Sequence, residues 1–254
     1  MLLGVVIPVY NEQGLLPLLV SRLDATPRPV GPDASPVTRH VFIIDDGSTD
    51  GTTDLLPEYD RREDITCLYS GINQGKGSAL RRGFSAAIEK GCDAVIVQDA
   101  DLEYDPGDQA RVLAPILDGR ADAVIGTRFL GETHRVLYYW HSVVNKALTV
   151  LSNMLSNMNL TDIECGTKAF SHRVLAEITP SLRENRFGIE PELIARLARL
   201  RLPPTGHPED TPQPIRVYEV PISYAGRTYA EGKKIGWRDG LGAIRSILRY
   251  NLFG

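Results

Sequence analysis

The chain has 254 residues and a mass of 28.0 kDa, which is enough for one large domain or two small ones with a sizeable buried core. Hydrophobic residues make up 43% of the sequence and charged residues 24%, so wholesale disorder is excluded. The formal net charge of −4 excludes a generally basic nucleic-acid-binding protein, although residues 227–254 carry six basic and two acidic side chains. An acidic body is therefore followed by a basic tail.

The sequence shows no sign of secretion, disulfides or a membrane span. The N-terminus lacks the basic region of a signal peptide and reaches Pro8 too early for one. No apolar run approaches the ~18 residues that cross a bilayer. Cys67, Cys92 and Cys165 form no CxxC pair and are expected to be buried, reduced thiols. We therefore expect a cytoplasmic protein, or one that is peripheral on the cytoplasmic membrane face.

The first half of the chain alternates predicted strands with predicted helices. Residues 4–9 form an apolar, β-branched run, and leucines at helical spacing follow from Leu15 to Leu23. The alternation continues with strands expected at 40–45, 65–70, 93–98 and 121–126 and helices at 50–58, 75–90 and 106–118. This pattern predicts an α/β fold with a mostly parallel sheet and helices on both faces. In such sheets, ligands bind beyond the carboxyl ends of the strands.

The second half is less regular. We expect a helix at 136–158, a strand at 165–170, a helix at 189–201, a strand at 215–222 and a final helix from 236. Two proline-rich stretches, 27–38 and 203–214, are expected to be solvated surface insertions. The sequence thus predicts one large α/β domain over 1–235 and a C-terminal amphipathic helix over 236–254.

Polar and acidic residues cluster where the first, second and fourth predicted strands end. They are Pro8, Tyr10 and Glu12, then Asp45 and Asp46, then Asp99, Ala100, Asp101 and Glu103. Neighbouring carboxylates repel one another unless a cation or hydrogen-bond donors are present. Asp45 and Asp46 can simply cap the next helix, whereas the three carboxylates within residues 99–103 suit a hard, oxygen-liganded divalent ion.

A glycine-rich segment over residues 71–78 opens the helix expected at 75–90. Its spacing, G-x-x-x-G-K-G-S, is one residue short of a P-loop, and Lys76 is followed by Gly instead of Ser or Thr. The helix start at Gly75 favours an anion, and a plain strand-to-helix turn is the equal alternative.

Taken in order, the segments IPVYNE, IDDGSTDGT, NQGKGSAL, DADLEYDP and GTR resemble the inverting family-2 glycosyltransferases with the GT-A, Rossmann-like fold. The resemblance is strongest to the dolichyl-phosphate mannose synthase and polyprenyl-phosphate glycosyltransferase branch. The later segments DIECGTKAF, NRFGIEPEL and EVPISYAGRTYAEGKKIGWRDG extend it to the C-terminus. The shared order of these motifs, rather than any one of them, carries the resemblance.

The resemblance implies a site for a nucleotide sugar and a metal ion. The base, ribose and phosphates of the donor would contact Pro8, Tyr10, Glu12, Asp45, Asp46, Gly75, Lys76, Asp99 and Ala100. Asp99 and Asp101 would bind Mg²⁺ or Mn²⁺ on the donor diphosphate, with Glu103 as a third ligand. Arg227, Lys233 and Lys234 match the basic segment that closes over the diphosphate, and a solvated charged loop is the alternative.

The acceptor is left open by the residues. A phosphate acceptor is already ionised and would need a cation such as Arg128, which the resemblance places at the acceptor phosphate. A hydroxyl acceptor would instead need a carboxylate base, and Asp162, Glu164 and Glu190 are available. Asp162 stands where related enzymes have an acidic residue near the acceptor, and a loop or N-cap carboxylate is its alternative.

Two helical segments favour a lipid acceptor. The last helix combines apolar residues, among them Leu241, Ile244, Ile247 and Leu248, with arginines, as an interfacial helix does. The segment 138–158 places three aromatic residues ahead of an apolar stripe. Core packing or a homodimer contact is the alternative for both.

The leading hypothesis is an inverting, metal-dependent glycosyltransferase. It would move a hexose from a nucleotide sugar to polyprenyl phosphate and release a nucleoside diphosphate. The alternatives are transfer to a sugar or small-molecule hydroxyl, and a non-catalytic nucleotide-sugar-binding protein.

Overall fold

A computed structural model describes residues 1–31, 34–131, 135, 138–227 and 237–253. Its strands are β1 (Leu2–Val9), β2 (Thr38–Asp45), β3 (Ile65–Tyr69), β4 (Ala94–Val97), β5 (Ala123–Thr127), β6 (Lys168–Ser171), β7 (Arg201–Leu202), β8 (Gln213–Pro214) and β9 (Val217–Pro221). Its α-helices are α1 (Leu16–Ala25), α2 (Thr52–Tyr59), α3 (Lys76–Glu89), α4 (Gln109–Leu117), α5 (Tyr139–Ser156), α6 (His172–Ile178), α7 (Ile189–Arg199) and α8 (Trp237–Leu252), and short 3₁₀ turns cover Pro106–Asp108 and Thr179–Ser181.

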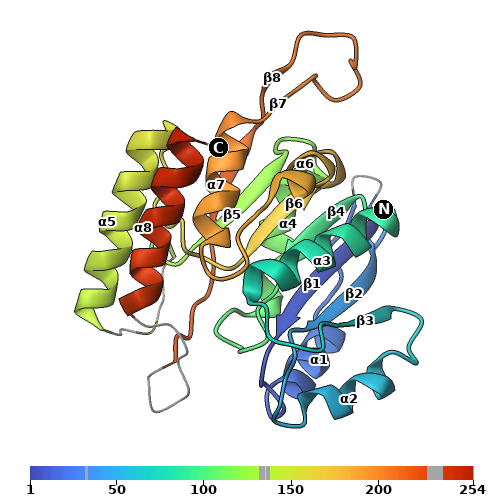
Figure 1. Cartoon of the computed structure of the whole chain (residues 1–254). Helices are drawn as coiled ribbons and strands as arrows, with labels where there is room; N and C mark the ends of the chain where they lie inside the picture. The colour runs from blue at the N-terminus through green and yellow to red at the C-terminus, as the bar shows by residue number, and fades with distance from the viewer. Residues whose placement is uncertain (32–33, 132–134, 136–137, 228–236, 254) are drawn as a thin grey trace.

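Seven strands form one sheet in the order β3-β2-β1-β4-β6-β5-β9 (Figure 1). β1 pairs in parallel with β2 and β4, and β5 pairs in parallel with β9, whereas β6 is antiparallel to both of its neighbours. The chain moves from β1 to β2 and β3 on one side and then crosses to β4 on the other. The carboxyl ends of β1 and β4 therefore flank the point where strand order reverses, which is where open α/β sheets bind ligands.

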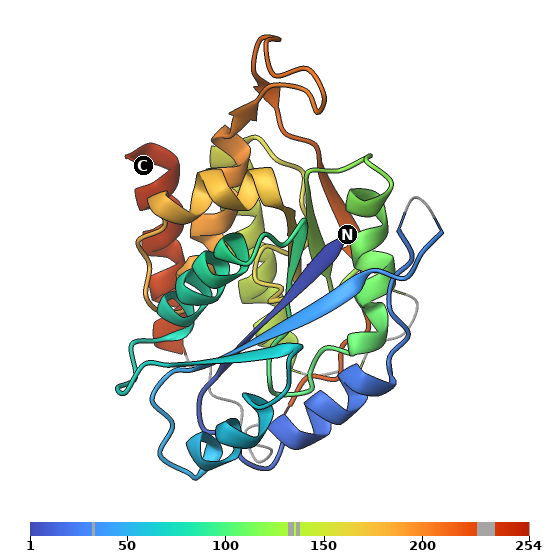
Figure 2. The ribbon, with the colours of Figure 1, turned by 90° about the vertical axis from the view of Figure 1, so that its right-hand side faces the viewer.

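Helices cover both faces of the sheet (Figure 2), as expected. Side chains alternate between the faces along each strand, so that Val5 and Ile7 face one core while Val6 faces the other. The first core packs against α1, α2 and α4, and the second against α3, α6, α7 and parts of α5 and α8. The prediction of a mostly parallel sheet with helices on both faces is confirmed.

Three local features differ from the expected elements. Helix α6 follows β6 without a loop, and its seven residues are too few to show a helical period. The last two residues of the stretch 203–214 form β8, which pairs with β7. The residues between these two strands project as a loop (Figure 1). The stretch 27–38 ends earlier than expected, because Val37 is buried in the core and Thr38 already begins β2.

Helices α5 and α8 lie side by side on the flank of the sheet (Figure 1) and pack with α7. Ala243 and Ile247 point into the core, so α8 has a packed face. Within the described ranges, no helix combines the length and the hydropathy needed to cross a bilayer.

Candidate active site

Acidic residues from two strand ends meet one arginine from a distant segment. Glu12 follows β1, whereas Asp99 and Asp101 follow β4, on either side of the reversal in strand order. The guanidinium of Arg227, which follows β9, places Nη2 3.0 Å from Asp101 Oδ2 and Nη1 3.6 Å from Glu12 Oε1. The structure thus brings together three of the residues that the sequence predicts for the donor and its metal, namely Glu12, Asp101 and Arg227.

Lys76 extends this cluster into a buried chain of charges. Its Nζ lies 2.8 Å from Asp99 Oδ1 and 2.9 Å from Asp99 Oδ2, and also 2.9 Å from Glu190 Oε1. The other oxygen of Glu190 accepts a hydrogen bond from Lys168, a lysine with no exposed surface. Burial raises the pKa of Glu190, but the two lysines outweigh it and the net shift is downward. Glu190 is therefore held as a carboxylate.

The pKa values of the carboxyl groups of Asp99 and Asp101 are both raised, first of all by burial. Burial raises the pKa of Asp99, and although Lys76 lowers it, Asp101 and Glu190 add to the rise. Burial and the neighbouring Glu103 raise the pKa of Asp101 in the same way, against the attraction of Arg227. An added cation would relieve both rises.

A glycine keeps Asp99 open to such a cation. A Cβ at Gly166 would lie 2.3 Å from Asp99 Oδ2 and 3.0 Å from Lys76 Nζ, so any larger residue would press on the carboxylate. Two carboxylates together with the phosphates of a bound nucleotide are a common Mg²⁺ ligand set. Asp99 and Asp101 therefore fit a divalent ion, with Lys76 as a stand-in cation at Asp99.

Glu103 is occupied by other groups. The Tyr224 hydroxyl donates to its Oε2 at 3.1 Å, and the backbone N–H of Arg227 donates to its Oε1 at 2.8 Å. The described part of the chain contains no ready-made group of three His, Cys, Asp or Glu side chains that could hold a metal. The three-carboxylate set expected over residues 99–103 is thus not preassembled, because Glu103 tethers the segment that carries Arg227.

The acids at the end of β2 shape loops. Asp45 accepts hydrogen bonds from the Ser48 N–H and the Thr53 hydroxyl. Asp46 accepts from the backbone N–H of Gln74 at 2.9 Å and of Gly75 at 2.6 Å. The amide of Gly75 therefore already binds a carboxylate of the protein, which favours the plain turn over a phosphate loop.

The remaining residues predicted for the donor differ in accessibility. Tyr10 is 36% exposed, Pro8 is partly buried and Ala100 is buried. Lys233 and Lys234 lie outside the described residues.

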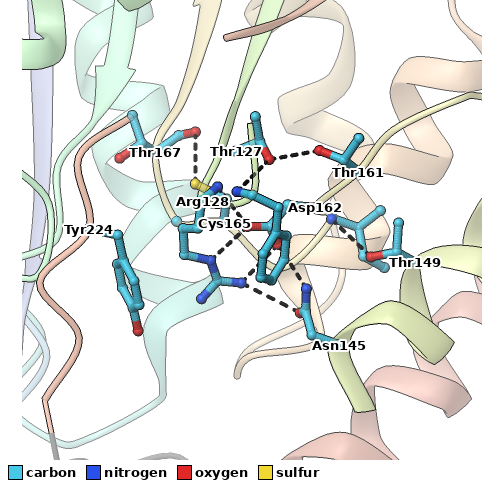
Figure 3. Close-up of polar contacts among 12 residues, drawn as sticks. Thr127, Arg128, Asn145, Thr149, Thr161, Asp162, Cys165, Thr167 and Tyr224 are labelled. Atoms are coloured by element: carbon cyan, nitrogen blue, oxygen red, sulfur yellow. Dashed lines mark hydrogen bonds and ion pairs between the residues drawn. The ribbon is translucent and has the colours of Figure 1, made fainter. Parts of the chain in front are cut away.

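Arg128 and Asp162 form a second, adjoining centre (Figure 3). Arg128 Nε lies 2.6 Å from Asp162 Oδ2 and Nη2 lies 2.8 Å from Oδ1, which also accepts from the Asn145 side chain at 3.1 Å. The guanidinium carbon of Arg128 is 5.2 Å from the centre of the Tyr224 ring. Tyr224 also donates a hydrogen bond to Glu103 and so links this centre to the acidic residues after β4.

Asp162 is unsuited to act as a base. Its side chain is fully buried, and both of its oxygens accept hydrogen bonds. Burial raises its pKa, but the charge and hydrogen bonds of Arg128 outweigh burial and lower it overall. Asp162 therefore positions Arg128, as a bidentate acid does for a guanidinium.

Glu164 differs from the other two candidate bases. Its Oε1 is enclosed and has no hydrogen-bond partner among the described residues. Burial raises its pKa to about 7, with a further contribution from Glu190, while Lys168 and Arg128 oppose the rise. Of the three carboxylates available as a base, Glu164 alone has a pKa near neutrality.

This pKa predicts a pH-dependent contribution of Glu164 to stability. The ordinary pKa of a glutamate is 4.5. Between pH 4.5 and about pH 7, Glu164 is therefore protonated in the folded chain but ionised in the unfolded chain. Stability from this group is therefore complete below pH 4.5 and is lost as pH rises through about 7. The loss is up to about 3 kcal/mol.

Glu164→Gln should make the free energy of unfolding fall less steeply as pH rises. Denaturant unfolding at several pH values should show Glu164→Gln as stable as the wild type near pH 4 and more stable at pH 8. Equal slopes for the two proteins would contradict the assignment. Glu63→Gln, a substitution of a carboxylate in the loop before β3, is the control.

Three residues of the site were not foreseen from the sequence. Tyr224 and Asn145 lie in segments whose predicted roles were different, and nothing local marks them. Lys168 had one available signal, since it is the only charged residue of the short apolar strand β6.

Comparison with known proteins identifies the family of this chain. The family model "Glycosyl transferase family 2" matches residues 4–179. An undecaprenyl-phosphate mannosyltransferase of Micrococcus luteus is 29% identical over 251 residues, covering 97% of this chain and 93% of that protein. A polyprenol monophosphomannose synthase of Mycolicibacterium smegmatis is 30% identical over 185 residues, covering 72% and 66%.

Among solved structures, the fold is similar to glucosyl-3-phosphoglycerate synthase from Mycobacterium tuberculosis in complex with Mn²⁺, UDP and phosphoglyceric acid. The TM-score is 0.65 at 18% identity, covering 99% of this chain and 79% of that one. The sheet order and strand-end acids described above, together with the match over residues 4–179, show that the chain belongs to glycosyl transferase family 2.

Proposed function

We propose that the protein is an inverting, metal-dependent glycosyltransferase that moves a hexose from a nucleotide sugar to polyprenyl phosphate. The observation that carries this proposal is the position of Arg128. Asp162 holds its guanidinium beside Tyr224, which in turn binds Glu103 next to Asp101. A preorganised guanidinium recognises a phosphate, and it lies next to the cluster assigned to the donor.

The relatives support the same acceptor. The names of the two proteins reported above specify undecaprenyl phosphate and polyprenol monophosphomannose. Both are more similar in sequence to this chain than the structural neighbour, whose complex contains phosphoglyceric acid.

The mechanism follows from the charges of the site. Asp99 and Asp101 would hold Mg²⁺ or Mn²⁺, which when bound offsets the negative charge that develops on the departing diphosphate. Arg227 adds a fixed positive charge on the same side. Arg128 orients an acceptor phosphate whose oxygen bonds to the anomeric carbon as the bond to the diphosphate breaks. A single displacement of this kind inverts the anomeric centre and needs no base, because the phosphate is already ionised.

A membrane surface would supply such an acceptor. Helices α5 and α8 carry exposed apolar residues that could contact the membrane. Exposed apolar residues on this two-helix face are Tyr139, Trp140, Val144, Val150 and Met154 on α5, and Leu241, Ile244, Leu248 and Leu252 on α8. Among the residues of the expected apolar stripe on the last helix whose burial is described, Ile247 is packed into the core and Leu241, Ile244 and Leu248 are exposed. Trp140 precedes Asn145, the partner of Asp162, by about 7.5 Å along the axis of α5. Helix α5 thus carries both exposed aromatic residues and the side chain that helps to hold Asp162.

Removing the aromatic residues should weaken attachment to lipid. Trp140→Ser combined with Tyr139→Ser is expected to lower binding to anionic phospholipid vesicles about tenfold or more, because each ring contributes buried apolar area at the interface. Co-sedimentation with vesicles measures this. Tyr69→Ser, which removes an aromatic residue exposed on β3, is the control and should bind as the wild type does. Equal binding by all three proteins would contradict the membrane face.

The reaction itself is tested with a panel of nucleotide sugars, with polyprenyl phosphate present and absent. The proposal expects one donor to be consumed in the presence of lipid and Mn²⁺ or Mg²⁺, with formation of a glycosylated lipid phosphate. Consumption that does not depend on the lipid phosphate would exclude this acceptor. Binding of a nucleotide sugar without transfer to any acceptor would favour a non-catalytic role.

Transfer to a hydroxyl is the second candidate, and Glu164 is the observation that favours it. A carboxylate with a pKa of about 7 and an unpaired oxygen suits a general base. Glu164→Gln should abolish transfer to a hydroxyl acceptor but leave transfer to polyprenyl phosphate close to the wild-type rate. The variant therefore separates the two acceptors.

A further inference from the structure

Lys76 lies between the carboxylates of Asp99 and Glu190, and Glu190 also binds a second lysine, Lys168. The ammonium group lies within 2.9 Å of both oxygens of Asp99 and of Oε1 of Glu190. Oε2 of Glu190 accepts from Lys168, which also donates to the carbonyl oxygens of Ile163 and Cys165. Lys168 is therefore fixed from three sides, whereas Lys76 has two alternative acids.

This arrangement matters when a metal approaches Asp99. A divalent ion and an ammonium group cannot share both oxygens of one carboxylate without strong repulsion. A buried lysine that lost its only partner would be strongly destabilised. Lys76 avoids this cost, because Glu190 already contacts it and is held as a carboxylate by Lys168.

We propose that Lys76 is a built-in counter-ion of Asp99 that a divalent metal displaces onto Glu190. Glu190 is then a positioning residue for metal entry. It binds no metal itself but stabilises the displaced lysine. The proposal rests on the metal-dependent function proposed above, and it assigns a role to the first turn of α7, which lies far from the DADLEYDP segment in the sequence.

Direct titration of the full chain with Mn²⁺ alone, followed by the electron paramagnetic resonance signal of free Mn²⁺, tests the exchange. Lys76→Met should bind Mn²⁺ about tenfold more tightly than the wild type, because no ammonium competes for Asp99. Glu190→Gln should bind about tenfold more weakly, because the displaced lysine loses its second partner. Lys90 is exposed at the C-terminal end of α3, the helix that Lys76 begins. Lys90→Met should therefore bind Mn²⁺ with the affinity of the wild type.

The double variant Lys76→Met/Glu190→Gln separates exchange from a general change in electrostatic field. If Glu190 acts only through Lys76, the double variant binds Mn²⁺ as tightly as Lys76→Met. Additive effects would show that each charge acts on the metal independently and would overturn the proposal. Thermal unfolding without metal identifies a variant that fails to fold, and Lys76→Met compared with Lys90→Met then decides the outcome, since equal affinities overturn the exchange.

Failure of the two proposals can be told apart. A wild-type chain that binds no Mn²⁺ would remove the metal site and with it both the exchange and the metal dependence of transfer. A wild-type chain that binds Mn²⁺ with the same affinity as Lys76→Met and Glu190→Gln would overturn the exchange alone.

Discussion

Asp162→Asn is expected to lower the rate of sugar transfer about 100-fold or more while leaving the affinity for the nucleotide sugar close to that of the wild type. Asp162 binds Arg128 through both carboxylate oxygens, and Asn keeps the shape but loses the charge and one acceptor. The guanidinium would then lose the geometry in which we propose that it meets the acceptor phosphate. Initial rates at varied acceptor concentration, together with nucleotide-sugar binding by calorimetry, measure the two effects separately.

A second Asp–Arg pair, at the other end of β5 from Arg128, provides a matched control. Asp122 precedes β5 and binds Arg216 through both oxygens, at 3.0 Å to Nε and 3.1 Å to Nη2, as Asp162 binds Arg128 after β5. Asp122→Asn should therefore destabilise the fold without changing the transfer rate. The positioning role of Asp162 would be contradicted if Asp162→Asn transferred sugar normally, or if the two variants lost activity in proportion to their lost stability.

The sheet and its strand ends could be predicted because both depend on local pattern. Continuous apolar runs predict buried parallel strands, and parallel strands bring their carboxyl ends to one edge, so Glu12 and Asp99 were expected to be near each other. The antiparallel direction of β6 could not be predicted, because its four residues have the same local pattern in either direction.

The individual roles of the acids could not be predicted, because they depend on partners far away in the sequence. Asp46, Glu103 and Asp162 all look like ligand-binding carboxylates. In the structure Asp46 binds the amide of Gly75, Glu103 binds Tyr224, and Asp162 binds Arg128. Motif spacing records which residue types are present but not which long-range pairs they form.

Asp101→Asn is expected to reduce transfer about 1,000-fold and to abolish its dependence on divalent metal, since electrostatic stabilisation of the departing diphosphate is worth several kcal/mol. The fold should survive, because Arg227 keeps its contacts with Glu12 and Glu103 when Asp101 loses its charge. Transfer rates measured over a range of Mn²⁺ concentrations, with thermal unfolding alongside, test both expectations.

The control for this substitution removes a carboxylate that is also paired with an arginine but lies away from the site. Asp118 follows α4 on the surface and binds Arg120, so Asp118→Asn should retain the wild-type rate and the wild-type response to Mn²⁺. If Asp101→Asn kept a saturable response at the same Mn²⁺ concentration as the wild type, the metal would have to bind elsewhere. In that case the raised pKa of Asp101 would reflect only burial and the neighbouring Glu103. A joint loss of rate and metal response, confined to Asp101→Asn, would instead tie the excess negative charge after β4 to the chemistry of the donor.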